Sequence, residues 1–530
     1  MKATYILKSK SIFNGTAPNP FSGGVVINGE KIVGVFPESM LTKYSDENTK
    51  VIDYGDKLIM PGFIDSHMHF GQAFDFLDPT YCIDIGAATT FEGIMDMMKS
   101  FAEKNPENPV IYATDFNYFN LDPVVIPDVK LLDKYFPDKP CLIQTWETHT
   151  YYANTKAIEM AGFTKDTPDP NNGIGKYEDG ELNGVFNDTV AFALQKIVQR
   201  PACKRHNSLI NFMNILNENG ITGVACMYPC GTEKPYTLYK EMEDQLSVRI
   251  SFYPELLSFT KEDIEDYKKN YNGPMLKFGG LKNLIDGVIS VHTAWMSEPY
   301  YDDPSTKGFP AVPPEEVKEK ILEAASLGVP VRIHAIGDKA VTYVLDAFEE
   351  SKNKYGLLPK RNVMEHLEYV KDEDIPRFSE LNVVCDMQGR HITFYVDEGE
   401  KIMGNRAKLA FRWRDILDAG TIIGTGSDYP VVSFSPARCI YAAVTRKHED
   451  GHPKGGWFPE QCVTLAEILK AYTYGSACAI NRDDELGTLE PGKFADITVL
   501  DRNLFAVPEE EYLEMKSVMT MVNGKIVFEK

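Results

Sequence analysis

The sequence predicts an α/β protein built on a closed, TIM-type (β/α)8 barrel, with a small β domain made from both ends of the chain. Eight short apolar segments with strand character alternate with segments of helical spacing along the middle of the chain. The two ends are rich in β-type residues and hairpin signals. Eight alternating βα units favour a parallel sheet that closes on itself.

The predicted barrel strands share a run of apolar residues bounded by polar or turn residues. They are Met60–Asp65, Ile221–Met227, Val248–Tyr253, Leu281–Asp286, Val329–Ala335, Asn362–His366, Asn382–Met387 and Thr421–Ser427. Helical spacing of apolar residues between strands is clearest in Pro314–Leu327 and Ala340–Lys354.

The segment between the first two predicted strands is far too long for one loop of a compact domain. We therefore predict an inserted α/β subdomain over residues 72–215, with strands at Pro109–Thr114 and Cys141–Trp146. The barrel as a whole is expected over residues 58–484.

We expect residues 1–57 and 485–530 to form one small β domain built from both termini. Short β-rich runs flank Asn28-Gly29 near the start and Asn523-Gly524 near the end. Both dipeptides are strong signals for a two-residue hairpin loop.

The charge and cysteine content of the chain indicate which kinds of partner and which compartment to expect. The chain carries 55 basic and 77 acidic residues, a net charge of −22, which disfavours nucleic acid and anionic membranes as partners. Nine cysteines without a Cys-x-x-Cys pair suit a reducing compartment. The first ten residues lack the apolar stretch of a signal peptide. We expect a cytoplasmic enzyme acting on a small molecule, and homo-oligomerisation stays open.

Polar side chains cluster at the predicted strand ends. His67 and His69 end the first strand, Lys282 lies in the fourth, His334 ends the fifth, His366 ends the sixth and Asp428 follows the eighth. The carboxyl ends of barrel strands converge at one mouth, where catalytic residues sit. His67 and His69 also share one strand face, because side chains alternate. The pattern therefore predicts a metal site.

Each of these residues alone has a simpler interpretation. A strand-end histidine can be a core residue, Asp428 can be a helix N-cap, and Lys282 can extend its ammonium group to solvent. Their joint order along the chain favours the metal site over coincidence.

These residues and their flanking motifs resemble the amidohydrolase superfamily, in particular the branch that includes the N-substituted formamide deformylases. The resemblance covers nearly the whole chain and rests on Met60–His69, Thr148–Asn154, Asp286-Gly287 and Gly487–Asp496. It implies a distorted barrel with a small β-sandwich. It also implies metal ligation by His67, His69, Lys282, His334, His366 and Asp428. Lys282 would be carboxylated by carbon dioxide to bridge two metals, and an unmodified lysine beside a single metal is the alternative.

The expected mechanism is metal-ion catalysis of C–N bond hydrolysis in an amide or N-substituted formamide. One or two zinc ions are expected, with manganese or iron as alternatives. Zinc lowers the pKa of its bound water to about 7. The resulting hydroxide would attack the polarised carbonyl, and Asp428 would carry the water's proton to the leaving amine.

Four further residues are predicted to bind the substrate: His149, His292, Trp295 and His391. For each, a surface or packing role is an equal alternative. Gly389, two residues before His391, stands where the branch would carry a proline, which leaves the shape of this loop open.

Two competing functions remain at this level. One is hydrolysis of another bond, in a cyclic amide, an ester or a heterocycle. The other is a non-catalytic regulatory homologue that keeps the barrel, since one fold hosts many functions.

Overall fold

The structure, a computed structural model, describes residues 2–146, 148–169, 173–198, 202–228 and 235–530. The chain divides into two compact units. The first unit comprises Met1–Met68, Met213–Tyr228 and Tyr239–Lys530, and the second comprises His69–Phe212 and Pro229–Leu238. The domain boundaries inferred from the sequence stay predictions.

A parallel β-barrel forms the centre of the first unit and confirms the predicted α/β barrel class. Its strands run in the orders β15-β14-β13-β6 and β16-β17-β18-β19-β20, with every neighbouring pair parallel. They are β6 (Phe63–Met68), β13 (Ile221–Met227), β14 (Arg249–Tyr253), β15 (Leu276–Phe278), β16 (Leu281–Leu284), β17 (Val331–Ala335), β18 (Val363–His366), β19 (Val384–Asp386) and β20 (Ile423–Gly424).

Backbone hydrogen bonds join the two barrel sheets on both sides. The N–H of Lys282 in β16 donates to the carbonyl of Pro254, just beyond β14, at 2.8 Å. On the other side, the N–H of Ser66 in β6 donates to the carbonyl of Thr425, just beyond β20, at 3.3 Å. The ring of parallel strands is thereby closed, and its carboxyl ends meet at one mouth.

The first predicted barrel strand is in fact two strands that meet at Gly62. β5 (Leu58–Pro61) pairs with a strand of the terminal sheet, whereas β6 pairs with β13 in the barrel. A Cβ on Gly62 would lie 2.2 Å from Cγ2 of Thr222. Any larger residue at this position would therefore clash with Thr222. The prediction missed this break because both halves are apolar and buried.

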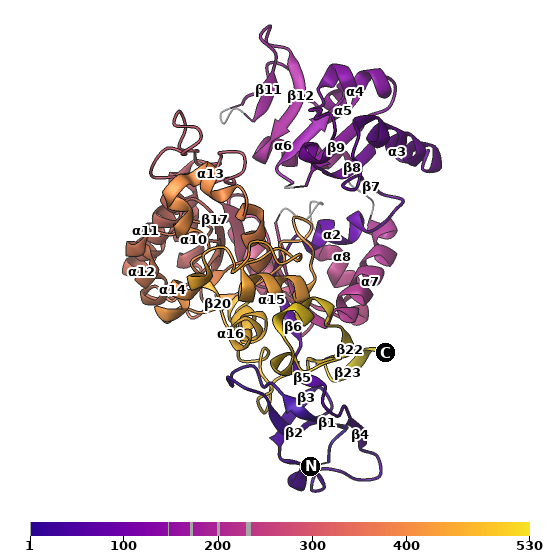
Figure 1. The fold of residues 1–530 in the computed structure, drawn as a ribbon, viewed down its shortest axis with the longest axis vertical. Helices are drawn as coiled ribbons and strands as arrows, with labels where there is room; N and C mark the ends of the chain where they lie inside the picture. The colour runs from indigo at the N-terminus through magenta and orange to yellow at the C-terminus, as the bar shows by residue number, and fades with distance from the viewer. Residues whose placement is uncertain (1, 147, 170–172, 199–201, 229–234) are drawn as a thin grey trace. The chain divides into compact units, whose positions relative to one another are not determined.

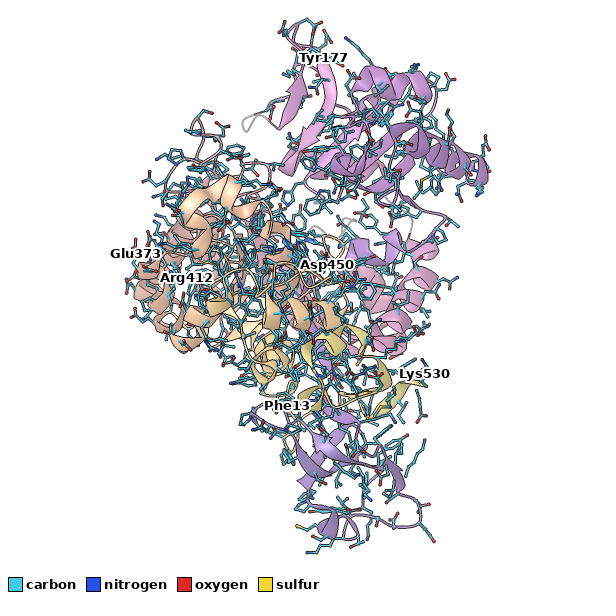
Figure 2. All side chains as sticks on the ribbon, viewed as in Figure 1. Phe13, Tyr177, Glu373, Arg412, Asp450 and Lys530 are labelled. Atoms are coloured by element: carbon cyan, nitrogen blue, oxygen red, sulfur yellow. The ribbon has the colours of Figure 1, made fainter. Side chains whose placement is uncertain are left out.

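Both ends of the chain contribute to one eight-stranded sheet, ordered β23-β22-β21-β5-β1-β2-β3 with β4 beside β1. Figure 1 shows β1 to β5 with β22 and β23, and Figure 2 labels Phe13 and Lys530 in this part of the first unit. The strands are β1 (Tyr5–Ile12), β2 (Phe21–Asn28), β3 (Lys31–Phe36), β4 (Lys50–Asp53), β5, β21 (Ile497–Leu500), β22 (Ser517–Val522) and β23 (Lys525–Glu529).

The two predicted hairpins are present in this sheet. Asn523 and Gly524 join β22 to β23 with φ of 52° and 72°, the positive values that a type I′ turn requires. In the first hairpin Asn28 still pairs with Lys31, so the loop is one residue later than predicted. Gly29, with φ of 60°, supplies its positive φ.

Helices surround the barrel in the first unit, and Figure 1 shows α10, α11 and α12 beside β17. The two predicted helices are confirmed as α10 and α11, since their apolar faces are buried. The helices are α1 (Glu38–Leu41), α9 (Lys261–Asn270), α10 (Pro314–Ser326), α11 (Asp338–Tyr355), α12 (Ile375–Glu380), α13 (Gly399–Met403), α14 (Trp413–Asp418), α15 (Pro436–Thr445), α16 (Leu465–Lys470) and α17 (Ser476–Ala479).

The second unit contains a six-stranded sheet ordered β11-β12-β10-β9-β8-β7. Neighbouring residues Ile111 and Tyr112 of β8 belong to two different hydrophobic clusters, so the sheet is buried on both faces. The strands are β7 (Ile83–Asp84), β8 (Ile111–Phe116), β9 (Cys141–Thr145), β10 (Thr150–Ala153), β11 (Ile174–Lys176) and β12 (Leu182–Asn187). β8 and β9 confirm the two strands predicted in this segment.

The helices of the second unit are α2 (Phe70–Phe76), α3 (Phe91–Lys104), α4 (Val129–Tyr135), α5 (Thr155–Ala161) and α6 (Asp188–Leu194). α7 (Ala202–Glu218) and α8 (Pro235–Glu241) contain residues of both units. None of the helices in the described part of the chain has the length and apolar character needed to cross a membrane.

Candidate metal centre

Five of the six predicted metal ligands lie in the first unit, at or near the carboxyl ends of barrel strands. They are His67 in β6, Lys282 in β16, His334 in β17, His366 at the end of β18 and Asp428 beyond β20. All five are buried, with at most 7% of any of these residues exposed. The sixth, His69, is the first residue of the second unit and the N-cap of α2.

Two sets of donor atoms in the first unit are close enough to hold a metal ion. His67, Glu365 and His366 form one set, and His366, His391 and Asp428 form the other. Within each set the candidate atoms lie within 4.8 Å of one another. Imidazole nitrogen with carboxylate oxygen is a donor set that zinc accepts, so these residues fit a divalent metal.

His67 lies between two carboxylates. Its Nδ1 is 3.1 Å from Oε1 of Glu365, and its Nε2 is 3.1 Å from Oδ1 of Asp428. Burial opposes the charged form of His67, but these carboxylates outweigh burial and raise its pKa to about 9. A bound metal would take the place of a proton on this ring, because metal ligands must be deprotonated.

His366 is oriented by an amide. Its Nδ1 donates to Oε1 of Gln388 at 2.8 Å, and Nε2 of Gln388 donates to the carbonyl of Asp386 at 3.3 Å, which sets the orientation of the amide. This leaves Nε2 of His366 as the atom for a metal. Burial, followed by the charge of His334, holds the pKa of His366 well below its ordinary value, so the ring is neutral.

His334 packs against His366, with ring centroids 4.5 Å apart. Its Nε2 donates to the carbonyl of Gly287 at 3.2 Å and lies 3.6 Å from Oδ1 of Asp286. Asp286 accepts backbone N–H groups of Trp295, Ile336 and Gly337 at 2.8–3.0 Å. These bonds place the Asp286 carboxylate beside the imidazole of His334.

A buried network of two cations and two anions lies next to the histidines. Lys282 pairs with Oε2 of Glu365, and Nε of Arg332 pairs with Oε1 of the same carboxylate at 2.7 Å. Arg332 also pairs with Asp386 and donates to the carbonyl of Ser66 at 2.6 Å. Burial lowers the pKa of Lys282. For Glu365, burial is outweighed by His67, Lys282 and Arg332, which hold its pKa well below the ordinary value.

Several residues of this site were missed by the sequence analysis, namely Glu365, Arg332, Asp386 and Gln388. Neighbouring residues on a strand point to opposite faces, so Glu365 and His366 were not expected to share a site. The φ of 71° at His366 ends the strand and lets both residues contribute to one donor set. A signal was present, because a charged residue within an apolar strand needs a buried partner.

His391, predicted as a substrate contact, belongs to one of the two donor sets of the candidate metal centre. Its Nε2 is 3.5 Å from Oδ2 of Asp428, and its ring stacks on that of His366 with centroids 5.7 Å apart. A Cβ on Gly389 would lie 2.8 Å from Sγ of Cys439. The glycine thus lets the loop of His391 approach α15 closely.

The other three predicted substrate contacts stay predictions. His292 lies between β16 and α10, where its Nε2 is 2.9 Å from Oδ1 of Asp302. The ring of Trp295 lies 5.7 Å from that of Tyr343 on α11. His149 is half-buried in the second unit, immediately before β10.

Comparison with known proteins assigns the class. Residues 50–528 match the model of the amidohydrolase family. The chain is 28% identical to a putative amidohydrolase of Bacillus subtilis, YtcJ, over 93% of each chain. It is 25% identical to the N-substituted formamide deformylase of Arthrobacter pascens, over 97% of this chain and 96% of that protein.

A solved structure shows the same architecture. An uncharacterised metal-dependent hydrolase of Pyrococcus horikoshii superposes with a TM-score of 0.77 at 26% identity, over 95% of this chain and 99% of that one. The protein belongs to the amidohydrolase family and is a hydrolytic enzyme, which confirms the resemblance seen in the sequence.

Proposed function

We propose that the protein hydrolyses a C–N bond of a small-molecule amide or N-substituted formamide, with Asp428 as the proton shuttle. The observation that carries this proposal is the convergence of His366, His391 and Asp428 in one donor set at the barrel mouth. The similarity to an N-substituted formamide deformylase supports the choice of bond.

We propose zinc as the metal, as one or two ions. The residues that would hold it are His67, His69, Lys282, His334, His366 and Asp428, with Glu365 as an additional oxygen donor. A divalent metal, when bound, polarises the scissile carbonyl and acidifies water. A carbamate on Lys282 would supply two oxygen donors at a position where the unmodified ammonium instead neutralises Glu365.

Asp428 is held for proton transfer by its neighbours. Its backbone N–H donates to the carbonyl of His67 at 2.7 Å. Its Oδ1 faces His67 at 3.1 Å, and its Oδ2 faces His391 at 3.5 Å. In the proposed reaction, Asp428 accepts a proton from the attacking water and delivers it to the leaving nitrogen. The two imidazoles stabilise the carboxylate before it accepts the proton and again after it has delivered the proton.

Finer details of the fold are part of the same proposal. We take the eight-stranded terminal sheet as the small β-sandwich of the family and residues 72–215 as an insertion after the first barrel strand. The participation of both termini in one sheet supports the first assignment. The separate six-stranded sheet supports the second.

The decisive experiment compares wild type, Asp428→Asn and the control Asp138→Asn, an exposed carboxylate of the second unit. Each zinc-loaded protein is assayed on N-alkyl formamides, linear amides, cyclic amides and esters, with metal content measured in parallel. We expect formate or carboxylate release by wild type and the control, and a loss of about 10²–10⁴-fold in kcat for Asp428→Asn, the usual contribution of a general acid–base.

Chelation should abolish turnover, and zinc should restore it. Full turnover by Asp428→Asn at unchanged metal content would refute the shuttle role. Turnover confined to esters would refute the proposed bond.

A further inference from the structure

Glu368 is a buried carboxylate beside the candidate metal centre that takes no part in the proposed reaction. Only 2% of the residue is exposed, and charged residues are rarely buried to this degree without a partner. Among the described residues its ion-pair partner is His391, whose Nδ1 lies 3.6 Å from Oε1 of Glu368. His391 is therefore the residue through which Glu368 can act on the site.

The backbone holds Glu368 firmly in this position. His366 and Leu367 have φ values of 71° and 52°, which are uncommon for residues other than glycine, and they turn the chain at the carboxyl end of β18. The N–H of Leu367 donates to the carbonyl of Ala335 at 3.2 Å, and the carbonyl of Glu368 accepts the N–H of Phe411 at 2.8 Å. A carboxylate anchored in this way can orient a ring that it contacts.

Tyr395 also lies beside this carboxylate and belongs, with His391, to the 3₁₀ segment Gly389–Tyr395. Burial, followed by the charge of Glu368, raises the pKa of Tyr395 well above its ordinary value. The phenol therefore stays protonated near neutral pH and can donate to Glu368, which only accepts when ionised. Glu368 thus faces two donors of one segment and ties that segment to the end of β18.

The ring of His391 lies between two carboxylates. Its Nδ1 faces Glu368, and its Nε2 is 3.5 Å from Oδ2 of Asp428. A neutral imidazole has one proton, so one nitrogen donates and the other accepts. Asp428 has a second imidazole at 3.1 Å, that of His67, whereas Glu368 has His391 alone among the described ion pairs. This difference favours the proton on Nδ1, towards Glu368.

We propose that Glu368 is a positioning residue that keeps the proton of His391 on Nδ1, so that Nε2 serves as a further metal ligand beside His366 and Asp428. A carboxylate that accepts from the far nitrogen of a metal-binding imidazole fixes both the tautomer and the ring orientation. The Nδ1–Oε1 separation is slightly longer than a hydrogen bond, and contacts in catalytic sites often shorten when the site is loaded. The inference rests on the proposed function only in that a metal binds at this centre.

The test measures zinc affinity by competition with a chelator, and the ring N–H of His391 by NMR of the full chain loaded with cobalt(II) in place of zinc. Each histidine bound to cobalt gives a strongly shifted, exchangeable N–H signal, and His391→Ala identifies the signal of His391. Glu368→Leu removes the acceptor. We expect it to raise the zinc dissociation constant about 10–100-fold, as loss of such a partner does, and to abolish the His391 signal.

Two further variants separate positioning from packing. Glu368→Gln keeps a carbonyl acceptor at the same reach, so it should retain the His391 signal and bind zinc nearly as wild type does. Glu368→Asp withdraws the carboxylate by one methylene, so it should weaken zinc binding and lose the signal, and it serves as the test if Glu368→Leu does not fold. Glu373→Leu, at an exposed glutamate labelled in Figure 2, is the matched control and should behave as wild type.

Neither measurement uses a substrate, so their outcome is separate from that of the proposed function. Normal zinc binding and a His391 signal without turnover of amides would refute the proposed bond and support the role of Glu368. An unchanged signal and zinc affinity in both Glu368→Leu and Glu368→Asp would overturn the positioning role. Equal losses in Glu368→Gln and Glu368→Leu would overturn it too. A wild-type spectrum identical to that of His391→Ala would show that His391 does not bind the metal.

Discussion

Asp428 and His67 are joined both through the backbone and through their side chains. The N–H of Asp428 donates to the carbonyl of His67 at 2.7 Å, and Oδ1 of Asp428 lies 3.1 Å from Nε2 of His67. The same backbone bond helps to close the barrel between its first and last strands. The contact that closes the barrel therefore also places these two side chains next to each other in the candidate metal centre.

Gly426 should be essential for this junction. A Cβ there would lie 2.3 Å from the backbone nitrogen of His67. We expect Gly426→Ala to displace His67, to reduce zinc affinity and to destabilise the fold by about 1–3 kcal/mol, as overpacking does. Gly223→Ala is the matched control in a neighbouring strand, where the nearest atom to a new Cβ is 3.6 Å away. Equal zinc affinity and urea stability of the two variants would contradict the prediction.

Glu365 should stabilise the barrel interior. Glu365→Gln removes the ion-pair partner of Lys282 and leaves Arg332 with Asp386. Breaking a buried ion pair from one side destabilises by about 3–5 kcal/mol. We expect a decrease of this size in the free energy of unfolding, measured with urea, and a lower zinc affinity. Glu509→Gln, at an exposed glutamate, should change neither. A near-neutral Glu365→Gln would show that the network does not act as a unit.

Lys282 tests the carbamate directly. If a carbamate supplies oxygen donors, Lys282→Ala should lose bound metal and turnover, and acetate or propionate should restore part of both by occupying the vacated space. Lys282→Met should not be rescued, because its side chain fills that space. Metal content and kcat are measured with and without the acid. Wild-type metal content in Lys282→Ala would exclude the bridging role.

Asp286 should make stability depend on pH. Burial raises its pKa from 3.8 to about 7, so between these values the folded state keeps a proton that the unfolded state has lost. The free energy of unfolding should therefore fall as pH rises, by about 1.4 kcal/mol per pH unit for one proton.

Urea unfolding of metal-free protein at several pH values checks this contribution. In Asp286→Asn the decrease with pH should be smaller by that amount, even if the variant is less stable at every pH. Asp138→Asn should keep the wild-type slope. An unchanged slope in Asp286→Asn would mean that this carboxyl does not hold the proton.

Much of the fold could be predicted from local patterns. Eight of the barrel strands were found because each is a short apolar run, whereas the short strand β15 was not predicted. The helices α10 and α11 were found because their buried residues recur at helical spacing. The break at Gly62 could not be found in this way, since burial on both sides hides the change of sheet. The first hairpin was placed one residue early, because Asn28 continues the strand ladder with Lys31.

The residues of the candidate site likewise fall into those that local sequence patterns predict and those that they do not. By itself, the sequence determined the residue types at the strand ends, among them His67, His366 and Asp428, because a parallel barrel brings such ends together. Only the tertiary structure decided that Glu365 joins them and that His391 stacks on His366. These placements depend on a positive φ at His366 and on close approach at Gly389. Both arise from long-range packing, which no local pattern of residues encodes.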